Sequence, residues 1–408
     1  MGCGTTETRA PALPTNGPPH SLRVALERVP WPLDPRHAQT RDEVLLVKTL
    51  FATPLRVDPR SGDVVPGLCR SWSSAGTRWM FRCRDPQRVA RAIPVGRVTV
   101  DGDLVHVRLP IRWLRFPYLL TSARSAVPGL PGPFRVVRAR RGQIIARRGD
   151  LTLVFREIEP HRAAVLFRRG QLDEAPVPLG DIRAAQLDHR VRAAVHVTQL
   201  LAVDTVLFDT GRGALAMLPN TRSAYAATVD RGDYRALVPE NQADAATSLV
   251  PGHTPRRVLA KDFRAARARI PSLPSVRVGI GADDETRYGR DLLVAVWRDV
   301  GLKAGPGGTD ARLVRLLAPY AQDEALLASL YLRGERCGGA SLVRALGERD
   351  QRRDLQRADD ECAARAALPV SWVADARFVS PRVSGWREDR LGVVDYSWVR
   401  FRASSRRP

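Results

Sequence analysis

The stretch LDPRHAQTRDEVLLVKTLFATPLRVDPRSGDVVPGLCRSW (33–72) has the pattern of a helix followed directly by a hairpin. Thr40 and Glu43 have the spacing of a capping box, in which each side chain accepts a hydrogen bond from the other residue's backbone amide. The helix must end before Pro54, because proline cannot continue it. One face of this helix is apolar over three positions, Val44, Val47 and Phe51.

The second half of the same stretch predicts a tight hairpin at 55–65. Short apolar runs flank the letters DPRSG, in which Pro59 and Gly62 supply the residues that turns require. Two more hairpins are expected downstream, one around SSAG (73–76) and one around Asp101-Gly102. Residues 55–110 are therefore predicted to be mostly antiparallel β structure.

Outside residues 55–110 the pattern changes to strands and helices in alternation. Short apolar or alternating runs predict strands at 21–29, 150–158, 276–281, 302–305 and 368–374. Helical spacing predicts helices at 161–170, 288–301 and about 343–367. Mixed elements of this kind predict an α/β protein.

Composition limits the class of protein. With 408 residues, of which 44% are hydrophobic and 26% charged, the chain is long and apolar enough to fold into two or three domains, or into two lobes of interleaved segments. Its formal net charge of +22 is typical of nucleic-acid-binding proteins, but the arginines are spread along the chain rather than gathered into a tail or strip. We therefore expect no specific nucleic-acid partner. No run approaches the roughly 18 apolar residues of a membrane span.

The five cysteines give two separate signals. Cys69, Cys83, Cys337 and Cys362 lack the spacing of a zinc site, and the sequence leaves open whether they pair or stay free. Cys3 follows a small residue and precedes a polar, Pro- and Gly-rich stretch, as in a bacterial lipoprotein after its signal peptide is removed. No apolar segment precedes Cys3, so either a start codon upstream is missed or the cysteine is incidental.

No motif for catalysis, a metal or a cofactor stands out. GIGAD (279–283) has Asp284 where the dinucleotide-binding fingerprint needs a later glycine, and its acids suit a helix N-terminus better. The seven histidines form no zinc-binding pair, and no G-x-S-x-G elbow is present. We expect no catalytic residue, no metal and no cofactor.

The order of the sequence segments described above resembles that of the family 5 extracellular solute-binding proteins, which include the oligopeptide- and dipeptide-binding proteins of ABC importers. The stretch 33–72 is similar to the family's opening, an LDP loop, a helix and the pattern L-x-x-x-D-x-x-G-x-x-x-P-x-L-A-x-S-W. TRWMFRCRD (77–85) resembles the aromatic strand that follows. Further similar blocks come in the family's order, at 125–137, 161–178, 225–255 and 379–386.

This resemblance implies an α/β, two-lobed periplasmic-binding-protein-like fold (type II, peptide-binding cluster) with a small antiparallel β subdomain. Residues 1–20 then form a flexible tether, 54–124 the small β subdomain, and 216–369 the second lobe. The first lobe is discontinuous and joins 21–53, 125–215 and 370–408.

The resemblance also implies a function. The protein would capture a small solute, peptide-like or other, in a cleft between the lobes and deliver it to ABC transporter permease subunits. By position rather than by motif, the loop that holds Val29, Trp31 and Asp34 is our candidate for a wall of that cleft.

Two localisations follow from the two interpretations of Cys3. A processed Cys3 predicts an extracellular protein held by a lipid anchor at the outer face of the cell membrane. The alternative is a trimmed, cytoplasmic, non-transport paralogue that acts as a ligand sensor or interaction protein.

Overall fold

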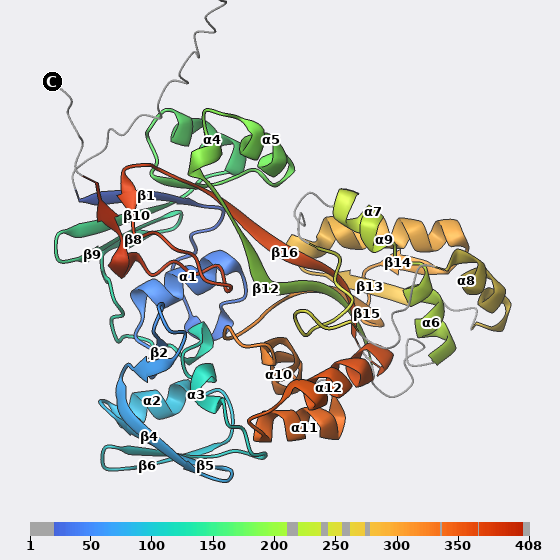
Figure 1. Cartoon of the computed structure of the whole chain (residues 1–408), viewed down its shortest axis with the longest axis horizontal. Coiled ribbons are helices and arrows are strands. Elements are labelled where there is room, and N and C mark those ends of the chain that lie inside the picture. Colours follow the sequence, from blue (N-terminus) through green and yellow to red (C-terminus); the bar gives the residue numbers. More distant parts are fainter. Residues whose placement is uncertain are drawn as a thin grey trace, which may run out of the picture.

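The computed structural model contains one ten-stranded sheet, surrounded by helices, and a separate four-stranded sheet (Figure 1). The structure describes residues 20–209, 219–237, 244–254, 262–273, 278–334, 337–365 and 367–402.

The large sheet is mixed, with strand order β14-β13-β15-β12-β16-β11-β1-β10-β9-β8. β1 pairs in parallel with β10 and β11, whereas β12 pairs antiparallel with β15 and β16. This arrangement agrees with the predicted α/β class. The strands are β1 Ser21–Leu26, β8 Arg135–Arg140, β9 Gln143–Arg148, β10 Leu151–Glu157, β11 Glu174–Pro176, β12 Val195–Phe208, β13 Val278–Ala282, β14 Ala304–Pro306, β15 Ala311–Leu317 and β16 Ala367–Val379.

Two long strands, β12 and β16, run through both halves of this sheet (Figure 1). We call the half with β1 and β8–β11 the first lobe and the half with β13–β15 the second lobe. The pairing of β12 with β16 shifts register between Gln199 and Val203, where the chain passes from one lobe to the other. The predicted lobe boundary at 369–370 falls inside β16, and the one at 215–216 lies outside the described residues. The division of the chain into domains therefore stays our proposal.

Helices pack around each lobe (Figure 1). Those of the first lobe are α1 Arg41–Leu50, α4 Pro160–Arg168 and α5 Ile182–Leu187. Those of the second lobe are α6 Pro219–Ala227, α7 Arg231–Leu237, α8 Phe263–Arg269 and α9 Arg287–Val300. The predicted end of α9 is confirmed, because Gly301 caps it with a left-handed φ of 100°.

Helix α1 begins at the predicted capping box. The Thr40 side chain accepts from the Glu43 amide, and the Glu43 carboxylate accepts from the Thr40 amide at 3.1 Å. The predicted apolar face packs against Ala123 and Ala126. A second face enters the main core through Leu45, Leu46 and Leu50. The helix therefore lies between two packed layers.

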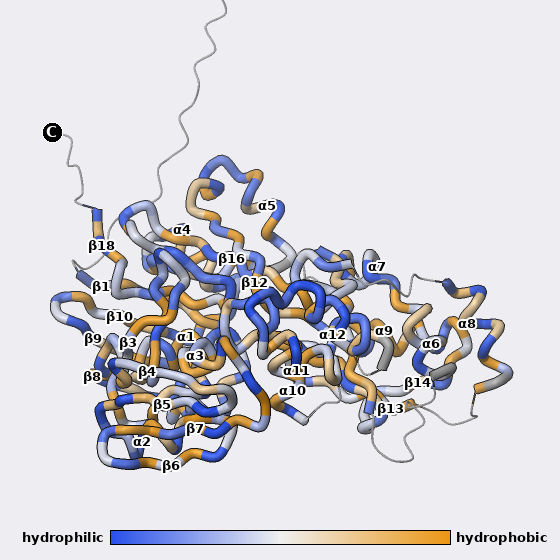
Figure 2. Tube along the Cα trace, turned by 60° about the horizontal axis from the view of Figure 1, so that its bottom comes forward, coloured by the Kyte–Doolittle hydropathy of each residue, from blue (hydrophilic) through white to orange (hydrophobic). Residues whose placement is uncertain are grey.

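The three predicted hairpins are all present. The first is β2 Leu55–Val57 with β3 Val64–Pro66, and the other two form the small sheet, in the order β4-β5-β7-β6. Along β5, buried and exposed residues alternate, and Trp79, Phe81 and Cys83 are the buried ones. Figure 2 shows hydrophobic and hydrophilic positions mixed through the small sheet. The strands of the small sheet are β4 Cys69–Ala75, β5 Arg78–Cys83, β6 Arg97–Asp101 and β7 Leu104–Arg108, and α2 Pro86–Ala92 and α3 Phe116–Leu119 lie beside it. The strands β17 Val383–Ser384 and β18 Arg400–Phe401 form a short pair near the end of the described chain.

The single helix predicted at about 343–367 is wrong. Two helices, α11 Gly339–Gly347 and α12 Arg352–Arg365, pack against each other, because the chain turns extended at Glu348. They follow α10 Ala325–Leu332. These three helices pack in the same core as the small sheet, and the Leu114 amide donates to the Leu346 carbonyl at 2.8 Å.

The structure answers the question of cysteine pairing that the sequence left open. Cys69 is joined to Cys83 across β4 and β5, and Cys337 is joined to Cys362 of α12. Each disulfide closes a loop, of 14 and 25 residues respectively. Cys3 lies outside the described residues.

Candidate functional site

A cavity of about 750 Å³ opens between the two lobes. The first lobe supplies the residues that lead into α1 and the turn after α3. The second lobe supplies the end of β12 and much of β15, and the end of α10 closes the remaining side. Because these segments come from distant parts of the chain, the cavity exists only in the folded protein.

The first-lobe wall is held by buried hydroxyl groups. The Ser125 hydroxyl donates to the Leu119 carbonyl at 3.0 Å, and the hydroxyls of Ser122 and Ser125 lie 3.2 Å apart. Both serines are buried. They fix the turn that carries Arg124, a half-buried cavity residue whose side chain has no ion pair with any carboxylate among the described residues.

The second-lobe wall is built on a buried ion pair. The register of β12 and β15 places Asp204 opposite Arg315. The fully buried Asp204 carboxylate accepts from Arg315 Nε at 2.8 Å and from the Tyr234 hydroxyl at 3.1 Å. Arg315 lines the cavity, so a buried carboxylate fixes the position of a cationic side chain at its surface.

Positive charge exceeds negative charge around the cavity. Its charged lining residues are Arg124, Arg312, Arg315, Arg333, Asp209 and Asp283. Arg312 pairs with Asp283 at 3.2 Å, and both are exposed. The arrangement favours a ligand that carries at least one anionic group.

Ion pairs that join distant segments hold the first lobe together. The buried Asp173 carboxylate accepts from Arg23 Nε at 2.8 Å and from Arg382 Nε at 2.6 Å. Burial opposes its ionisation, but the hydrogen bonds from both arginines hold the pKa of Asp173 below its ordinary value.

A second buried cluster lies where α1 meets β16. Arg41 contacts both Asp375 and Glu388. Burial and the nearby charge of Asp375 raise the pKa of Glu388 to about 8, although Arg41 opposes this shift. The two carboxyl groups therefore do not both ionise at neutral pH.

The three candidates for a cleft wall are not among the residues that line the cavity. Val29 is fully buried, and its amide donates to Glu157 Oε2 at 2.9 Å. Trp31 is 38% exposed. Asp34 accepts from the Arg36 amide, and this hydrogen bond lowers the pKa of the carboxyl. The cavity begins further along the same loop, at Ala38, so the role of the three residues stays a prediction.

Sequence reasoning missed the arginines of the cavity. Arg124 stands in TSARSAVPG (121–129), directly before a block that resembles the family, and this position was its only signal. Arg315 stands in β15, where the sequence analysis predicted no strand.

The described residues show neither a metal site nor a membrane-spanning helix. They contain no group of three or more His, Cys, Asp or Glu side chains that could hold a metal ion. No helix among them is both long enough and apolar enough to cross a bilayer.

No protein-family model matches the sequence, and no curated protein matches it either. Solved structures do match. The murein tripeptide binding protein MppA of Escherichia coli is 14% identical, with 95% of this chain and 99% of that chain covered and a TM-score of 0.75. The ABC transporter-associated periplasmic binding protein DppA from Helicobacter pylori, in complex with peptide STSA, is 13% identical, with 93% and 98% covered and a TM-score of 0.76.

A third similar structure contains a different kind of ligand. It is a substrate binding protein from Microbacterium hydrocarbonoxydans complexed with 4-hydroxybenzoate hydrazide. It is 16% identical, with 94% of this chain and 100% of that chain covered and a TM-score of 0.72.

These matches define the class of fold. The chain has the two-lobed fold of the oligopeptide- and dipeptide-binding proteins of ABC transporters, over more than nine-tenths of its length. The fold predicted from the sequence is confirmed. The similar proteins are named as binding proteins. Sequence identities of 13–16% support a shared fold and nothing finer.

Proposed function

We propose that this protein is the solute-binding component of an ABC importer, which captures a small solute between its lobes and delivers it to permease subunits. The observation that carries the proposal is the cavity of about 750 Å³ between the lobes, a size within the range of about 300–1,000 Å³ usual for small-molecule sites. The register shift in β12 between Gln199 and Val203 supplies a point at which the lobes can bend. No catalytic step is part of this function.

The ligand we propose carries an anionic group that Arg124 binds. Arg124 is half-buried at the cavity wall, and a guanidinium binds carboxylate or phosphate oxygens through a bidentate pair of hydrogen bonds. A peptide satisfies this requirement through its C-terminal carboxylate, as does a non-peptide acid. A similar structure holds a peptide, and another holds the neutral 4-hydroxybenzoate hydrazide, so ligands of proteins with this fold are not limited to peptides. The anionic group is proposed from the arginines of the cavity and not from these ligands.

Native mass spectrometry of gently purified protein tests ligand capture. We expect an additional mass of a few hundred daltons that is lost on denaturation. A bare protein mass, together with no response to a library of short peptides and organic acids, would favour the trimmed sensor or interaction protein instead. The same samples, with and without reducing agent, report whether the two disulfides are formed in the cell.

Arg124→Gln tests the proposed anionic anchor. Loss of a charged hydrogen bond in a half-buried site is expected to weaken binding by about tenfold or more. The fraction of protein that carries the co-purified mass should therefore fall. Arg183→Gln is the matched control, because Arg183 is exposed on α5 and does not line the cavity. Equal occupancy in the two variants would contradict the assignment.

We also propose export and lipid attachment through Cys3. Expression from the native locus with an alkyne-labelled fatty acid should label the protein in the membrane fraction. The Cys3→Ser variant should remain unlabelled. Absence of label from the parent protein would contradict lipid attachment and favour the cytoplasmic, non-transport alternative.

A further inference from the structure

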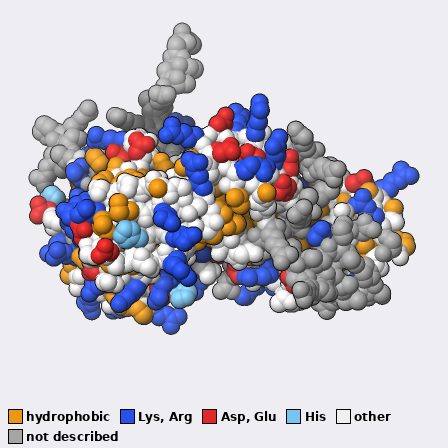
Figure 3. All heavy atoms as spheres, turned by 90° about the horizontal axis from the view of Figure 1, so that it is seen from below, with side chains coloured by type: hydrophobic (Ala, Val, Ile, Leu, Met, Phe, Trp, Pro, Cys, Tyr) orange, Lys and Arg blue, Asp and Glu red, His pale blue; other side chains and the backbone are white. Residues whose placement is uncertain are grey.

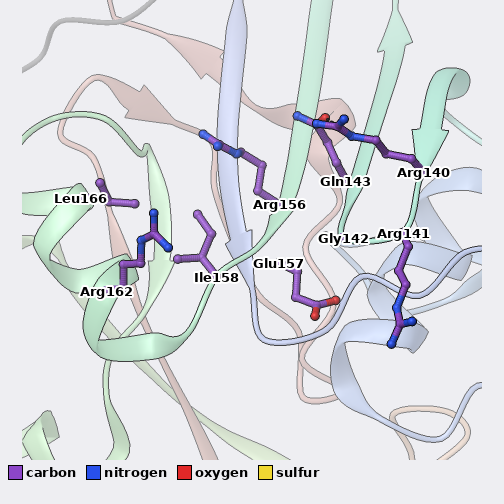
Figure 4. A pocket seen from close by; sticks show the side chains of 9 residues that line it. All are labelled: Arg140, Arg141, Gly142, Gln143, Arg156, Glu157, Ile158, Arg162 and Leu166. Carbon is purple, nitrogen blue, oxygen red and sulfur yellow. Dashed lines mark hydrogen bonds between the residues drawn. The ribbon is translucent and has the colours of Figure 1, made fainter.

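A second hollow, of about 310 Å³, lies on the first lobe and shares no lining residue with the inter-lobe cavity (Figure 4). The β8–β9 turn, the end of β10 and the start of α4 form its walls. Its charged lining residues are Arg140, Arg141, Arg156, Arg162 and Glu157. The hollow therefore has a formal excess of three positive charges.

The backbone beneath the hollow is fixed by hydrogen bonds that join the β8–β9 turn to the end of β10 and to the loop after β1. The Gly142 amide donates to the Val29 carbonyl at 3.1 Å, and the Glu157 amide donates to the Gly142 carbonyl at 2.9 Å. Gly142 has a φ of 77°, which favours glycine at this turn. The Glu157 carboxylate is itself engaged by the Val29 amide. The arginines thus project from a rigid frame.

The arginines of the hollow are not neutralised by neighbouring acids. Arg140 Nε donates to Gln143 Oε1 at 3.1 Å, which leaves the Gln143 amide nitrogen as a donor. Among the described residues, no carboxylate pairs with the side chain of Arg141, Arg156 or Arg162. Guanidinium groups gathered in this way repel one another, and a bound anion relieves the repulsion.

Figure 4 shows how these side chains are arranged. Arg156, from β10, and Arg162, from α4, lie on the side of the hollow where Ile158 and Leu166 form an apolar surface. Arg141 extends from the opposite side. In Figure 3, Lys and Arg side chains are spread over the face that the view shows. The four arginines of the hollow come from the β8–β9 hairpin, from β10 and from α4, which the fold brings together.

We propose that this hollow binds a phosphate-class oxyanion, held by the guanidinium groups of Arg156 and Arg162 with the Gln143 amide as a further donor. The planar guanidinium matches the spacing of phosphate oxygens, and two of them can engage one tetrahedral group. This site is independent of the ligand in the inter-lobe cavity.

Isothermal titration with inorganic phosphate, at ionic strength held constant with chloride, tests the proposal. We expect R156Q/R162Q to bind phosphate at least tenfold more weakly than the parent protein. The control R78Q/R97Q removes the same charge from exposed arginines of the small sheet, and its affinity should stay within twofold of the parent. Equal weakening in both double variants, which would reflect net charge alone, overturns the proposal.

Vesicles distinguish a free anion from a lipid headgroup. Binding to phosphatidylglycerol but not phosphatidylcholine vesicles, lost in R156Q/R162Q, assigns the same site to a lipid phosphate. A parent protein that binds neither free phosphate nor phosphatidylglycerol overturns the proposal. Melting temperatures without phosphate verify folding, and Arg162→Gln alone replaces the double variant if that variant unfolds. Retention of the co-purified mass by R156Q/R162Q separates this test from that of the inter-lobe ligand.

Discussion

The two walls of the inter-lobe cavity use charged residues in opposite ways. The first-lobe wall presents mainly small and uncharged side chains, with Arg124 as its charged member. That lobe buries other charges elsewhere, where Asp173 joins segments far apart in the sequence. The second-lobe wall carries charges on the cavity surface itself, including Arg312 and Arg315. The comparison indicates that the first lobe buries its ion pairs away from the cavity, whereas the second lobe places ion-paired side chains on the cavity surface.

Asp173→Asn tests the role of the first lobe's buried ion pairs, and of the variants considered it should lower the free energy of unfolding most. The change leaves Arg23 and Arg382 without their shared carboxylate, and loss of one partner of a buried ion pair costs about 3–5 kcal/mol. Urea unfolding measures the loss. Asp34→Asn is the control in the same lobe, because within the described part of the chain its exposed carboxylate pairs only with its near neighbours Arg36 and His37. Similar losses in the two variants would contradict a special role for Asp173.

Arg315→Gln should affect both stability and binding. The buried Asp204 keeps the Tyr234 hydroxyl as a donor but loses the Arg315 guanidinium, so we expect a loss of about 2–3 kcal/mol in unfolding free energy. Because Arg315 lines the cavity, the co-purified mass should also decrease. A variant that loses stability but keeps full ligand occupancy would show that this ion pair is purely structural.

Glu388→Gln should remove a pH dependence of the free energy of unfolding that arises from the buried cluster of the first lobe. The folded protein binds the Glu388 proton more tightly than the unfolded chain does, since the pKa of Glu388 rises from its ordinary 4.5 to about 8. Its stabilising contribution is therefore complete below about pH 4.5, decreases as pH rises and is lost above about pH 8. Between these two pH values the slope is about 1.4 kcal/mol per pH unit. Urea unfolding from pH 5 to 8 should show a steeper decline for the parent than for E388Q, and parallel curves would refute this.

Arg312→Gln should give the smallest effect. Its ion pair with Asp283 is exposed on both sides, and such pairs contribute about 0–1 kcal/mol and weaken with salt. A double-mutant cycle with Asp283→Asn, at low and high salt, measures the coupling. A coupling above about 2 kcal/mol would mean that the second-lobe wall is stabilised as strongly as the first lobe's buried pairs.

Local elements were predictable because their signals lie close together in the sequence. The capping box needs only Thr40 and Glu43, and the Asp101-Gly102 hairpin needs only a turn and its flanking strands. The order of similar blocks then gave the class of fold. The break between α11 and α12 was missed, because helical spacing continues through a point where the packed helices fold back on each other.

The candidate site was less predictable than the fold. The sequence directed attention to Val29, Trp31 and Asp34, whereas the cavity begins at Ala38 of the same loop. Which part of a loop faces a cavity depends on the lobe opposite, and no local pattern contains that information. The same limit applies to Arg124.

The sequence by itself determined the α/β class, the helix after Thr40 and the hairpins, since neighbouring residues fix these features through caps, turns and periodicity. Only the tertiary structure decided the cavity lining, the disulfide partners and the site of each buried charge. Asp173 meets residues 150 positions before it and 209 after it, at Arg23 and Arg382. Contacts between residues so far apart in the sequence depend on the path of the whole chain. Closing such long loops costs conformational entropy, which the packing of the segments between them has to offset.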